Sequence, residues 1–352
     1  MTAASTADKD LRSEADEAAV ARPGLALAVV LAATFLINVD TTIVNVAIPA
    51  LSRELRASTS DLQWVIDAYN LAFAALILTG GTISDRYGRR RTLVGGLLLF
   101  AISSGAAAAV GSVGVLIAWR VVMGAAAAFV FPTTLSIISL AYPDRAERAK
   151  AIGAWGAATG AAVALGPIVG GEVLAHFWWG SVFVVMVPLA ALTAAAAMLV
   201  VPADRRTVRA PLDGAGLALA ALGLGALVYT IIEAPGAGWG SARTLAGYAV
   251  AALALAALVR AEQRSAYPML DVRLFANLRF TAASGAVTFA FFALFGFIFL
   301  IILYFQIMRG YSALEAGVRT LPSPSPSRSP PASAPRSPSA SATRPWWRRG
   351  CC

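Results

Sequence analysis

Residues 80–91 of the chain read Gly80-Gly81-Thr82-Ile83-Ser84-Asp85-Arg86-Tyr87-Gly88-Arg89-Arg90-Arg91. This charged stretch lies between two long apolar runs. It places one acid and four arginines within seven residues, in a chain of which only 13% is charged. Because lipid cannot solvate such a cluster, we expect a short turn at the edge of a membrane. Gly81 and Gly88 are expected to allow close approach and a tight turn there.

The composition of the chain is that of a membrane protein. Of its 352 residues, 58% are hydrophobic, and a soluble domain of this length could not cover so much apolar surface. Uncharged runs of about 20 residues match the roughly 30 Å hydrocarbon core of a bilayer. We therefore predict an all-α polytopic membrane protein embedded in a lipid bilayer.

The formal charge of +9 comes mostly from arginine. In a soluble protein this excess would suggest a nucleic-acid partner. Here the arginines fall in short loops between apolar runs, which is the bias expected of cytoplasmic loops in membrane proteins. We expect no nucleic-acid partner.

Nine apolar runs predict nine spanning helices. Their expected ranges are 25–48, 62–83, 92–111, 115–139, 150–172, 181–201, 214–233, 244–260 and 280–307. Arginine and lysine concentrate in every second loop, beginning with the loop between the second and third spans. The positive-inside rule therefore predicts a multi-pass protein of the cytoplasmic (inner or plasma) membrane with its N-terminus in the cytoplasm.

Polar segments divide the nine spans into blocks. The expected organisation is a disordered cytoplasmic tail at 1–24, a six-helix bundle at 25–201, a cytoplasmic linker at 202–213, two helices at 214–260, a second cytoplasmic linker at 261–279, one helix and the start of the next at 280–321, and a low-complexity Ser/Pro/Arg tail at 322–352.

The last of these segments differs in kind from the rest. From Pro322 the chain is rich in serine, proline and arginine and has no apolar periodicity, so it cannot form a spanning helix. Residues 311–317 nevertheless resemble the entry to a tenth helix. One interpretation is a reading-frame shift near Pro322, since repeated Ser-Pro codons in GC-rich code read Leu-Ala in a neighbouring frame. The other is a genuine disordered tail. The nucleotide sequence distinguishes them, because a shift requires further apolar helices in a neighbouring frame.

Asp40 is the first candidate functional residue, because it lies midway through the first expected span. An ionised carboxylate at that depth costs about 3 kcal/mol on insertion scales. Protonation or contact with a water-filled cavity relieves that cost, and both suit a proton carrier. The alternative is a carboxylate tied structurally to a neighbouring helix.

Arg120 is the second candidate, in the fourth expected span. Arginine stays charged under all conditions and needs an anion or water nearby. We hypothesise that Asp40 and Arg120 form a switch that couples protonation to conformation. The alternative is that Arg120 caps a vestibule at one membrane surface.

Several stretches resemble the Major Facilitator Superfamily. The pattern Gly-x-x-x-Asp-Arg-x-Gly-Arg-Arg resembles its signature loop between helices 2 and 3, and is filled here by Gly81, Asp85, Arg86, Gly88, Arg89 and Arg90. The resemblance implies the major facilitator fold. It also implies a gating role, in which Asp85 and the arginines hold one access state closed by pairing with neighbouring helix ends.

Two further motifs resemble the 14-helix drug/proton antiporters of the QacA/EmrB type. The stretch around Asp40 resembles their Asp-x-Thr-Ile-Val-Asn-Val-Ala-x-Pro motif, and Arg120 their Arg-x-x-x-Gly motif. The antiporter helix motif is matched by Gly153, Gly166, Pro167, Gly170 and Gly171, with Ala162 in place of one family glycine. The plain alternative for these glycines is tight packing in an alanine-rich membrane protein.

The resemblance implies a six-helix N-terminal bundle, two inserted helices and the first helix of an incomplete C-terminal bundle, so a C-terminally truncated chain is expected. It implies proton-coupled export of hydrophobic or cationic small molecules, with protons as the second partner. The alternatives are a truncated, non-transporting membrane protein and an exporter of one specific metabolite.

Weaker candidates lie along the expected substrate pathway. They are Asn45, Trp64, Asp67 and Tyr69. Tryptophan and tyrosine also serve as plain interface anchors. With one histidine and two adjacent terminal cysteines, the sequence offers no catalytic constellation, metal site or cofactor site. We expect a transporter rather than an enzyme.

Overall fold

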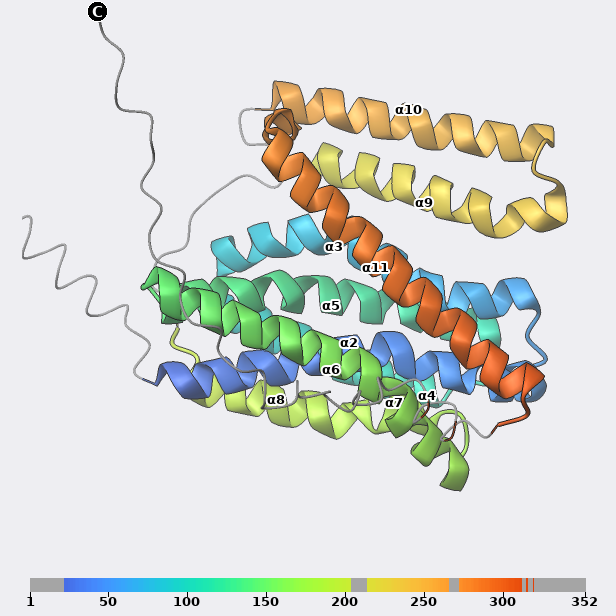
Figure 1. Cartoon of the computed structure of the whole chain (residues 1–352), viewed down its shortest axis with the longest axis horizontal. Helices are drawn as coiled ribbons and strands as arrows, with labels where there is room; N and C mark the ends of the chain where they lie inside the picture. Colours follow the sequence, from blue (N-terminus) through green and yellow to red (C-terminus); the bar gives the residue numbers. More distant parts are fainter. Residues whose placement is uncertain (1–21, 204–213, 266–271, 312–314, 316–318, 320–352) are drawn as a thin grey trace, which may run out of the picture. The chain divides into compact units, whose positions relative to one another are not determined.

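The computed structural model of the chain describes residues 22–203, 214–265 and 272–311, together with Glu315 and Arg319. All secondary-structure elements in these ranges are helical (Figure 1). The prediction of an all-α fold is therefore confirmed. The expected tail at 322–352 lies outside the described residues, so the frame-shift hypothesis stays a prediction.

The helices follow one another with short connections. In chain order they are α2 (Pro23–Glu54), α3 (Thr59–Tyr87), α4 (Arg89–Ala108), α5 (Val113–Ala141), α6 (Arg145–His176), α7 (Ser181–Val184), α8 (Met186–Val200), α9 (Gly214–Ala237), α10 (Ala242–Arg264), the 3-10 helix η1 (Val272–Ala276), α11 (Leu278–Leu303) and the π-helical segment η2 (Tyr304–Met308). Each expected span overlaps one helix, except that the sixth is divided into α7 and α8 and the ninth covers α11 and most of η2.

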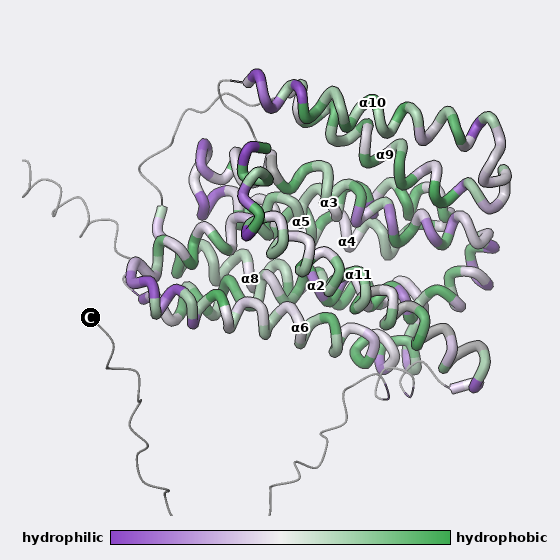
Figure 2. Tube along the Cα trace, turned by 45° about the horizontal axis from the view of Figure 1, so that its top comes forward, coloured by the Kyte–Doolittle hydropathy of each residue, from purple (hydrophilic) through white to green (hydrophobic). Residues whose placement is uncertain are grey.

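The described helices are long and apolar enough for a multi-pass membrane protein. Seven spans, with α7 and α8 counted as one, qualify by length and hydropathy, and α3 is an eighth if its two segments are taken together. Those segments, Thr59–Ile77 and Thr79–Tyr87, meet at an angle of 54°. Figure 2 shows hydrophobic residues along the helices and hydrophilic ones mostly near their ends. The shorter apolar stretch Leu278–Leu294 belongs to α11.

Side-chain caps fix where several helices begin. At α3, Ser58 and Asp61 form a reciprocal capping box, in which the Ser58 Oγ accepts from the Asp61 backbone N–H and the Asp61 carboxylate accepts from the Ser58 N–H. At α6, the carboxylate of Asp144 accepts hydrogen bonds from the backbone N–H groups of Ala146 and Glu147, at 2.9 and 3.0 Å. These bonds satisfy donors that the first helical turn leaves free.

The cap at Asp144 predicts a pH-dependent stability. Hydrogen bonds from the backbone of Glu147 and then of Ala146 lower the pKa of the Asp144 carboxyl. The ionised cap therefore stabilises the fold above the unfolded-state pKa, and this contribution is lost as pH falls through the lower folded-state pKa. We expect Asp144→Ala to lower the melting temperature at neutral pH and to have a much smaller effect in strong acid. A melting-temperature difference that stays constant down to acid pH would contradict this reading of the cap.

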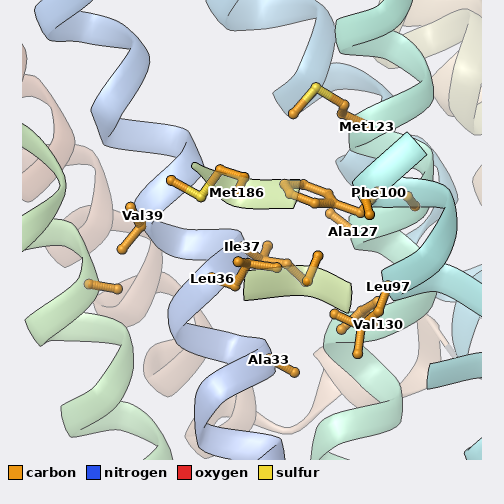
Figure 3. Packing of buried hydrophobic residues seen from close by; sticks show 14 of the residues in the cluster. Ala33, Leu36, Ile37, Val39, Leu97, Phe100, Met123, Ala127, Val130 and Met186 are labelled. Carbon is orange, nitrogen blue, oxygen red and sulfur yellow. The ribbon is translucent and has the colours of Figure 1, made fainter. Parts of the chain in front are cut away.

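Helices α2 to α8 share one apolar core. Figure 3 shows Leu36 and Ile37 of α2 packed near Leu97 of α4 and Val130 of α5, with Met186 of α8 close by. In lipid, helix association depends on close packing rather than on the hydrophobic effect. Small residues are therefore expected where the backbones approach one another most closely.

The backbones of α3 and α5 approach each other closely at two glycines. A β-carbon on Gly124 would lie 2.2 Å from the carbonyl oxygen of Tyr69, and one on Gly80 would lie 2.0 Å from that of Ala128. Only glycine allows this separation of the two backbones. The close contact predicted for Gly81 is wrong, because a β-carbon there would meet Pro132 at an ordinary 3.9 Å. The neighbouring Gly80 makes the contact instead.

Helices α9 and α10 pack against each other, and α9 also contacts α3. The Ser60 hydroxyl donates to the Glu233 carboxylate at 3.0 Å, and the rings of Trp64 and Tyr229 lie 6.0 Å apart. The domain boundaries expected at 202–213 and 261–279 fall partly outside the described residues and remain predictions.

Candidate functional site

The two charged residues singled out in the first and fourth spans meet inside the helical bundle. An oxygen of Asp40, Oδ2 on α2, lies 2.5 Å from Nη1 of Arg120 on α5. The side chains are 0% and 1% exposed, respectively. The two residues are 80 positions apart in the chain, so the pairing results from the packing of α2 against α5. The alternative in which Arg120 caps a surface vestibule is wrong for this conformation.

Helices α3 and α7 complete the surroundings of Arg120. The Arg120 Nε donates to the backbone carbonyl of Val65 at 2.9 Å. The guanidinium carbon lies 4.3 Å from the ring centroid of Tyr69 and 6.0 Å from that of Phe183, which suits a cation–π contact. Tyr69 in turn donates from its hydroxyl to the Ile37 carbonyl at 3.3 Å. The cation is therefore held by an anion, a carbonyl and two aromatic rings.

Asp40 is less fully satisfied than its partner. Its second oxygen, Oδ1, is buried and has no hydrogen-bond partner among the described residues. A buried ion pair offsets its desolvation cost only where the remaining lone pairs are also satisfied. The ion pair is formed in this conformation. Because Asp40 Oδ1 accepts no hydrogen bond, the pair lacks the complete set of partners expected of a purely structural pair.

The charged stretch at residues 80–91 forms the junction of two helices. α3 continues through Tyr87 and α4 begins at Arg89, so Gly88 alone separates them, with φ at 96°. This left-handed backbone favours glycine, which explains how two helices can meet without a loop. The short turn expected between the spans 62–83 and 92–111 is therefore reduced to one residue, because the polar residues on either side continue both helices. Gly81, Asp85 and Arg86 lie in α3, and Arg89 and Arg90 lie in α4.

The side chains at this junction have different surroundings. The Arg89 Nε donates to the hydroxyl of Ser136 on α5 at 2.6 Å. The guanidinium of Arg86 lies 5.5 Å from the ring centroid of Tyr87. Asp85 is exposed, whereas Arg90 is half-buried. Arg89 thus ties the start of α4 to the end of α5.

The glycines of the fifth expected span divide into two groups. In α6, a β-carbon on Gly166 would lie 2.0 Å from Oγ1 of Thr42, and one on Gly170 would lie 2.7 Å from the Ile43 side chain. These contacts lie on α2, immediately after Asp40. Gly171 and Pro167 are also buried. Gly153 has nothing within 4 Å of its would-be β-carbon, so in this conformation it makes no close approach.

The weaker candidates of the expected substrate pathway lie in different surroundings. Asn45 is half-buried in α2 and donates to the Thr41 carbonyl at 3.5 Å. Trp64 faces Tyr229 of α9. Asp67 is half-buried in α3. Tyr69 belongs with the buried pair, where its side chain is 1% exposed.

Sequence reasoning missed three components of the site. These are the Val65 carbonyl, the ring of Phe183 and the contact of Tyr69 with Arg120. Val65 and Tyr69 are four positions apart, so they share one face of a helix. That spacing could have identified the α3 face that meets the buried pair. Hydropathy does not distinguish Phe183 from the other apolar residues of its span.

The fold and the buried pair describe a polytopic helical membrane protein with an ion pair buried inside its helical bundle. Residues 30–323 match the Major Facilitator Superfamily. The chain belongs to this family, and is therefore a member of a transporter family with a multi-pass membrane fold.

Curated relatives of the chain carry names of resistance and export proteins. It is 35% identical over 303 residues to the tetracenomycin C resistance and export protein of Streptomyces glaucescens. It is 37% identical over 301 residues to the multidrug efflux pump LfrA of Mycolicibacterium smegmatis, and 36% identical over 301 residues to the methylenomycin A resistance protein of Bacillus subtilis. These matches cover 86%, 86% and 85% of this chain but 56%, 60% and 64% of the relatives, respectively. The chain therefore spans little more than half of each relative.

Solved structures support the same fold. A crystal structure of a peptide transporter POT in complex with sulfate superposes with a TM-score of 0.52 at 17% identity, over 68% of this chain and 53% of that one. At this identity the likeness concerns the fold alone.

Proposed function

We propose that the chain takes part in proton-coupled export of hydrophobic or cationic small molecules, as a member of the 14-helix drug/proton antiporter group. The names of its relatives support export of drug-like compounds. Proton coupling is supported by the buried pair of Asp40 and Arg120. In this proposal the N-terminus lies in the cytoplasm, as the distribution of arginine predicts.

The unpartnered Oδ1 of Asp40 is the observation that carries the proposed mechanism. When the carboxylate is ionised, its attraction to Arg120 keeps α2 and α5 together. When Asp40 takes up a proton, that attraction is lost, and the incompletely satisfied pair can separate. Arg120 then retains the Val65 carbonyl and the ring of Tyr69 as partners. Proton uptake would therefore change how α2 packs against α3 and α5.

The junction of α3 and α4 would transmit this change to the cytoplasmic surface. α3 carries the Val65 carbonyl near its start and Asp85 and Arg86 in its last turn. A shift of α3 at the buried pair would move the charged end of the same helix. We propose that Asp85 and the arginines of this junction stabilise one access state through such contacts.

The proposed function predicts pH-driven transport that depends on Asp40. The purified chain in lipid vesicles should move a fluorescent drug-like dye when a pH gradient is imposed. Asp40→Asn, which cannot exchange a proton, should reduce this movement to the passive leak. Asp40→Glu keeps a titratable carboxyl and should retain part of it. Dye movement in Asp40→Asn equal to that of the parent chain would contradict the proposed mechanism.

A second version of the chain is needed in the same assay. Alternating access requires two helical bundles that move around a site near the membrane midplane. The assay should therefore include a version in which the reading frame is shifted after Leu321. Transport by that version alone would assign the activity to the longer product and would support the non-transporting alternative for this 352-residue chain.

A narrower exporter is the second candidate function. Two of the relatives are named for resistance to a single compound, tetracenomycin C or methylenomycin A, whereas a third is named a multidrug pump. A panel of unrelated dyes and antibiotics in the vesicle assay distinguishes the two cases. Movement of one compound class alone favours the narrower exporter.

A further inference from the structure

A hollow with charged side chains lies between α2 and α6, at the end of the bundle where both helices begin (Figure 1). Its volume is about 440 Å³, and it is lined by Pro23 and Leu27 of α2, Tyr142 at the end of α5, and Glu147, Lys150 and Ala151 of α6. We call it the charged hollow, because it contains a carboxylate and an ammonium group. Both of these side chains are exposed, so a ligand can reach them.

A second hollow, which we call the apolar groove, lies further along the same two helices. Its volume is about 350 Å³, and it is lined by residues of α2, α6 and α8, among them Leu31, Phe35, Ala158 and Thr193. Leu31 follows Leu27 by four positions and Ala158 follows Ala151 by seven, so the members of each pair share one face of their helix. The apolar groove therefore continues the charged hollow away from the end of the bundle.

The length and polarity of the two hollows match one leaflet of a bilayer. Pro23 and Phe35 are twelve positions apart, which is about 18 Å along an α-helix, and half of the hydrocarbon core is about 15 Å. The deeper part is lined by apolar side chains and Thr193, whose hydroxyl already donates to the Leu189 carbonyl at 2.7 Å. A phospholipid has the same order of polarity, with a charged headgroup at the membrane surface and acyl chains beneath it.

The two charges of the hollow distinguish between headgroups. Glu147 and Lys150 are three positions apart on α6, so they are neighbours on its surface. A phosphate can accept hydrogen bonds from the Lys150 ammonium, and a primary ammonium can donate them to the Glu147 carboxylate. Phosphatidylethanolamine carries both groups. Phosphatidylglycerol lacks the cation, and the quaternary ammonium of phosphatidylcholine has no N–H to donate.

We propose that the charged hollow and the apolar groove together bind one phospholipid with a primary-amine headgroup. Its phosphate lies at Lys150, its ammonium at Glu147, and one acyl chain along Leu31 and Phe35. With the N-terminus in the cytoplasm, as proposed, this lipid belongs to the cytoplasmic leaflet. It contacts α2 and α6 at once, so it stabilises the packing of these two helices, one of which carries Asp40. The site requires neither proton coupling nor export, and it therefore goes beyond the proposed function.

Lipid binding to the purified, delipidated full chain, measured by native mass spectrometry, tests this proposal. The chain should bind phosphatidylethanolamine more tightly than phosphatidylglycerol or phosphatidylcholine with the same acyl chains. Glu147→Gln should weaken phosphatidylethanolamine binding roughly two- to fivefold without weakening phosphatidylglycerol binding, whereas Lys150→Gln should weaken both by a similar factor. Glycerophosphoethanolamine, which is the same headgroup without acyl chains, should not displace the lipid at equal concentration.

Arg53→Gln and Glu172→Gln are the matched controls. Arg53 lies in the last turn of α2 and Glu172 in the last turns of α6, so they belong to the same two helices but to their other ends. Both side chains are exposed, and their replacement changes the net charge by the same amounts as Lys150→Gln and Glu147→Gln. The controls should leave the affinities for all three lipids unchanged.

Several results would overturn the lipid site. They are equal affinity of the parent chain for the three lipids, an unchanged phosphatidylethanolamine affinity in Glu147→Gln or Lys150→Gln, an effect of either control as large as that of its counterpart, and displacement of the lipid by the free headgroup. Equal weakening of phosphatidylethanolamine and phosphatidylglycerol in Glu147→Gln would likewise contradict recognition of the amine. None of these measurements requires a proton gradient, so the lipid site and the proton-coupled function fail separately.

Discussion

Removing one charge of the buried pair is expected to destabilise the folded chain by about 3–5 kcal/mol, because the remaining charge stays buried without a partner. Asp40→Asn leaves Arg120, which cannot lose its charge, inside the bundle. Arg120→Met leaves a carboxyl that can be neutralised by a proton. We therefore expect Asp40→Asn to be the more damaging change. Unfolding by titration with a denaturing detergent measures the difference.

The double variant Asp40→Asn/Arg120→Met is the matched control for this prediction. It removes both charges, so its loss of stability should be smaller than the sum of the two single losses by at least about 1 kcal/mol. Strictly additive losses would mean that the two side chains do not interact energetically, despite their separation of 2.5 Å. The pair could then not serve as a switch.

The second large effect is expected at the α3–α5 contact. Gly124→Ala and Gly80→Ala each place a methyl group within about 2 Å of a backbone carbonyl of the facing helix. A backbone atom cannot rotate away as a side chain can, so the helices must separate, at a cost of roughly 1–3 kcal/mol or more. Thermal unfolding in detergent should show a marked loss of melting temperature for both variants.

Gly95→Ala provides the comparison. Gly95 lies in α4 with nothing within 4 Å of its would-be β-carbon, so alanine should be neutral or mildly stabilising because of its higher helix propensity. Gly124→Ala should also displace Tyr69, whose backbone it meets, and so disturb the surroundings of Arg120. Equal melting temperatures for Gly95→Ala and Gly124→Ala would contradict the close packing of α3 and α5.

Much of the fold follows from hydropathy alone. Long apolar runs separated by short polar segments locate the long helices of the described residues, because lipid requires each span to satisfy its own backbone hydrogen bonds. Helix ends are less predictable. The charged residues at 85–91 suggested a turn between the spans. They instead continue α3 and α4, so that one residue, Gly88, separates the two helices. Polarity marks the edge of the membrane, whereas the positive φ of Gly88 decides where a helix stops.

The site could be predicted only in part. Placing an acid or an arginine within an apolar span costs free energy, so such residues stand out as functional candidates in the sequence. The hypothesis that Asp40 and Arg120 meet agrees with the structure. The backbone carbonyl that contacts Arg120 could not be predicted, because every residue has one and nothing in the residue type of Val65 marks it.

The central claim is that Asp40 leaves its partner and exchanges a proton. Infrared difference spectroscopy of the full chain in lipid, recorded as the pH is lowered, tests it most directly, with Asp40→Asn as the reference. We predict a carboxylic-acid C=O band that appears on acidification in the parent chain, shifts in heavy water, and is absent from Asp40→Asn. If Asp40 instead stays ionised and paired with Arg120 throughout, so that the two spectra are identical in the carboxylic-acid region, the pair is structural and the proposed coupling is contradicted.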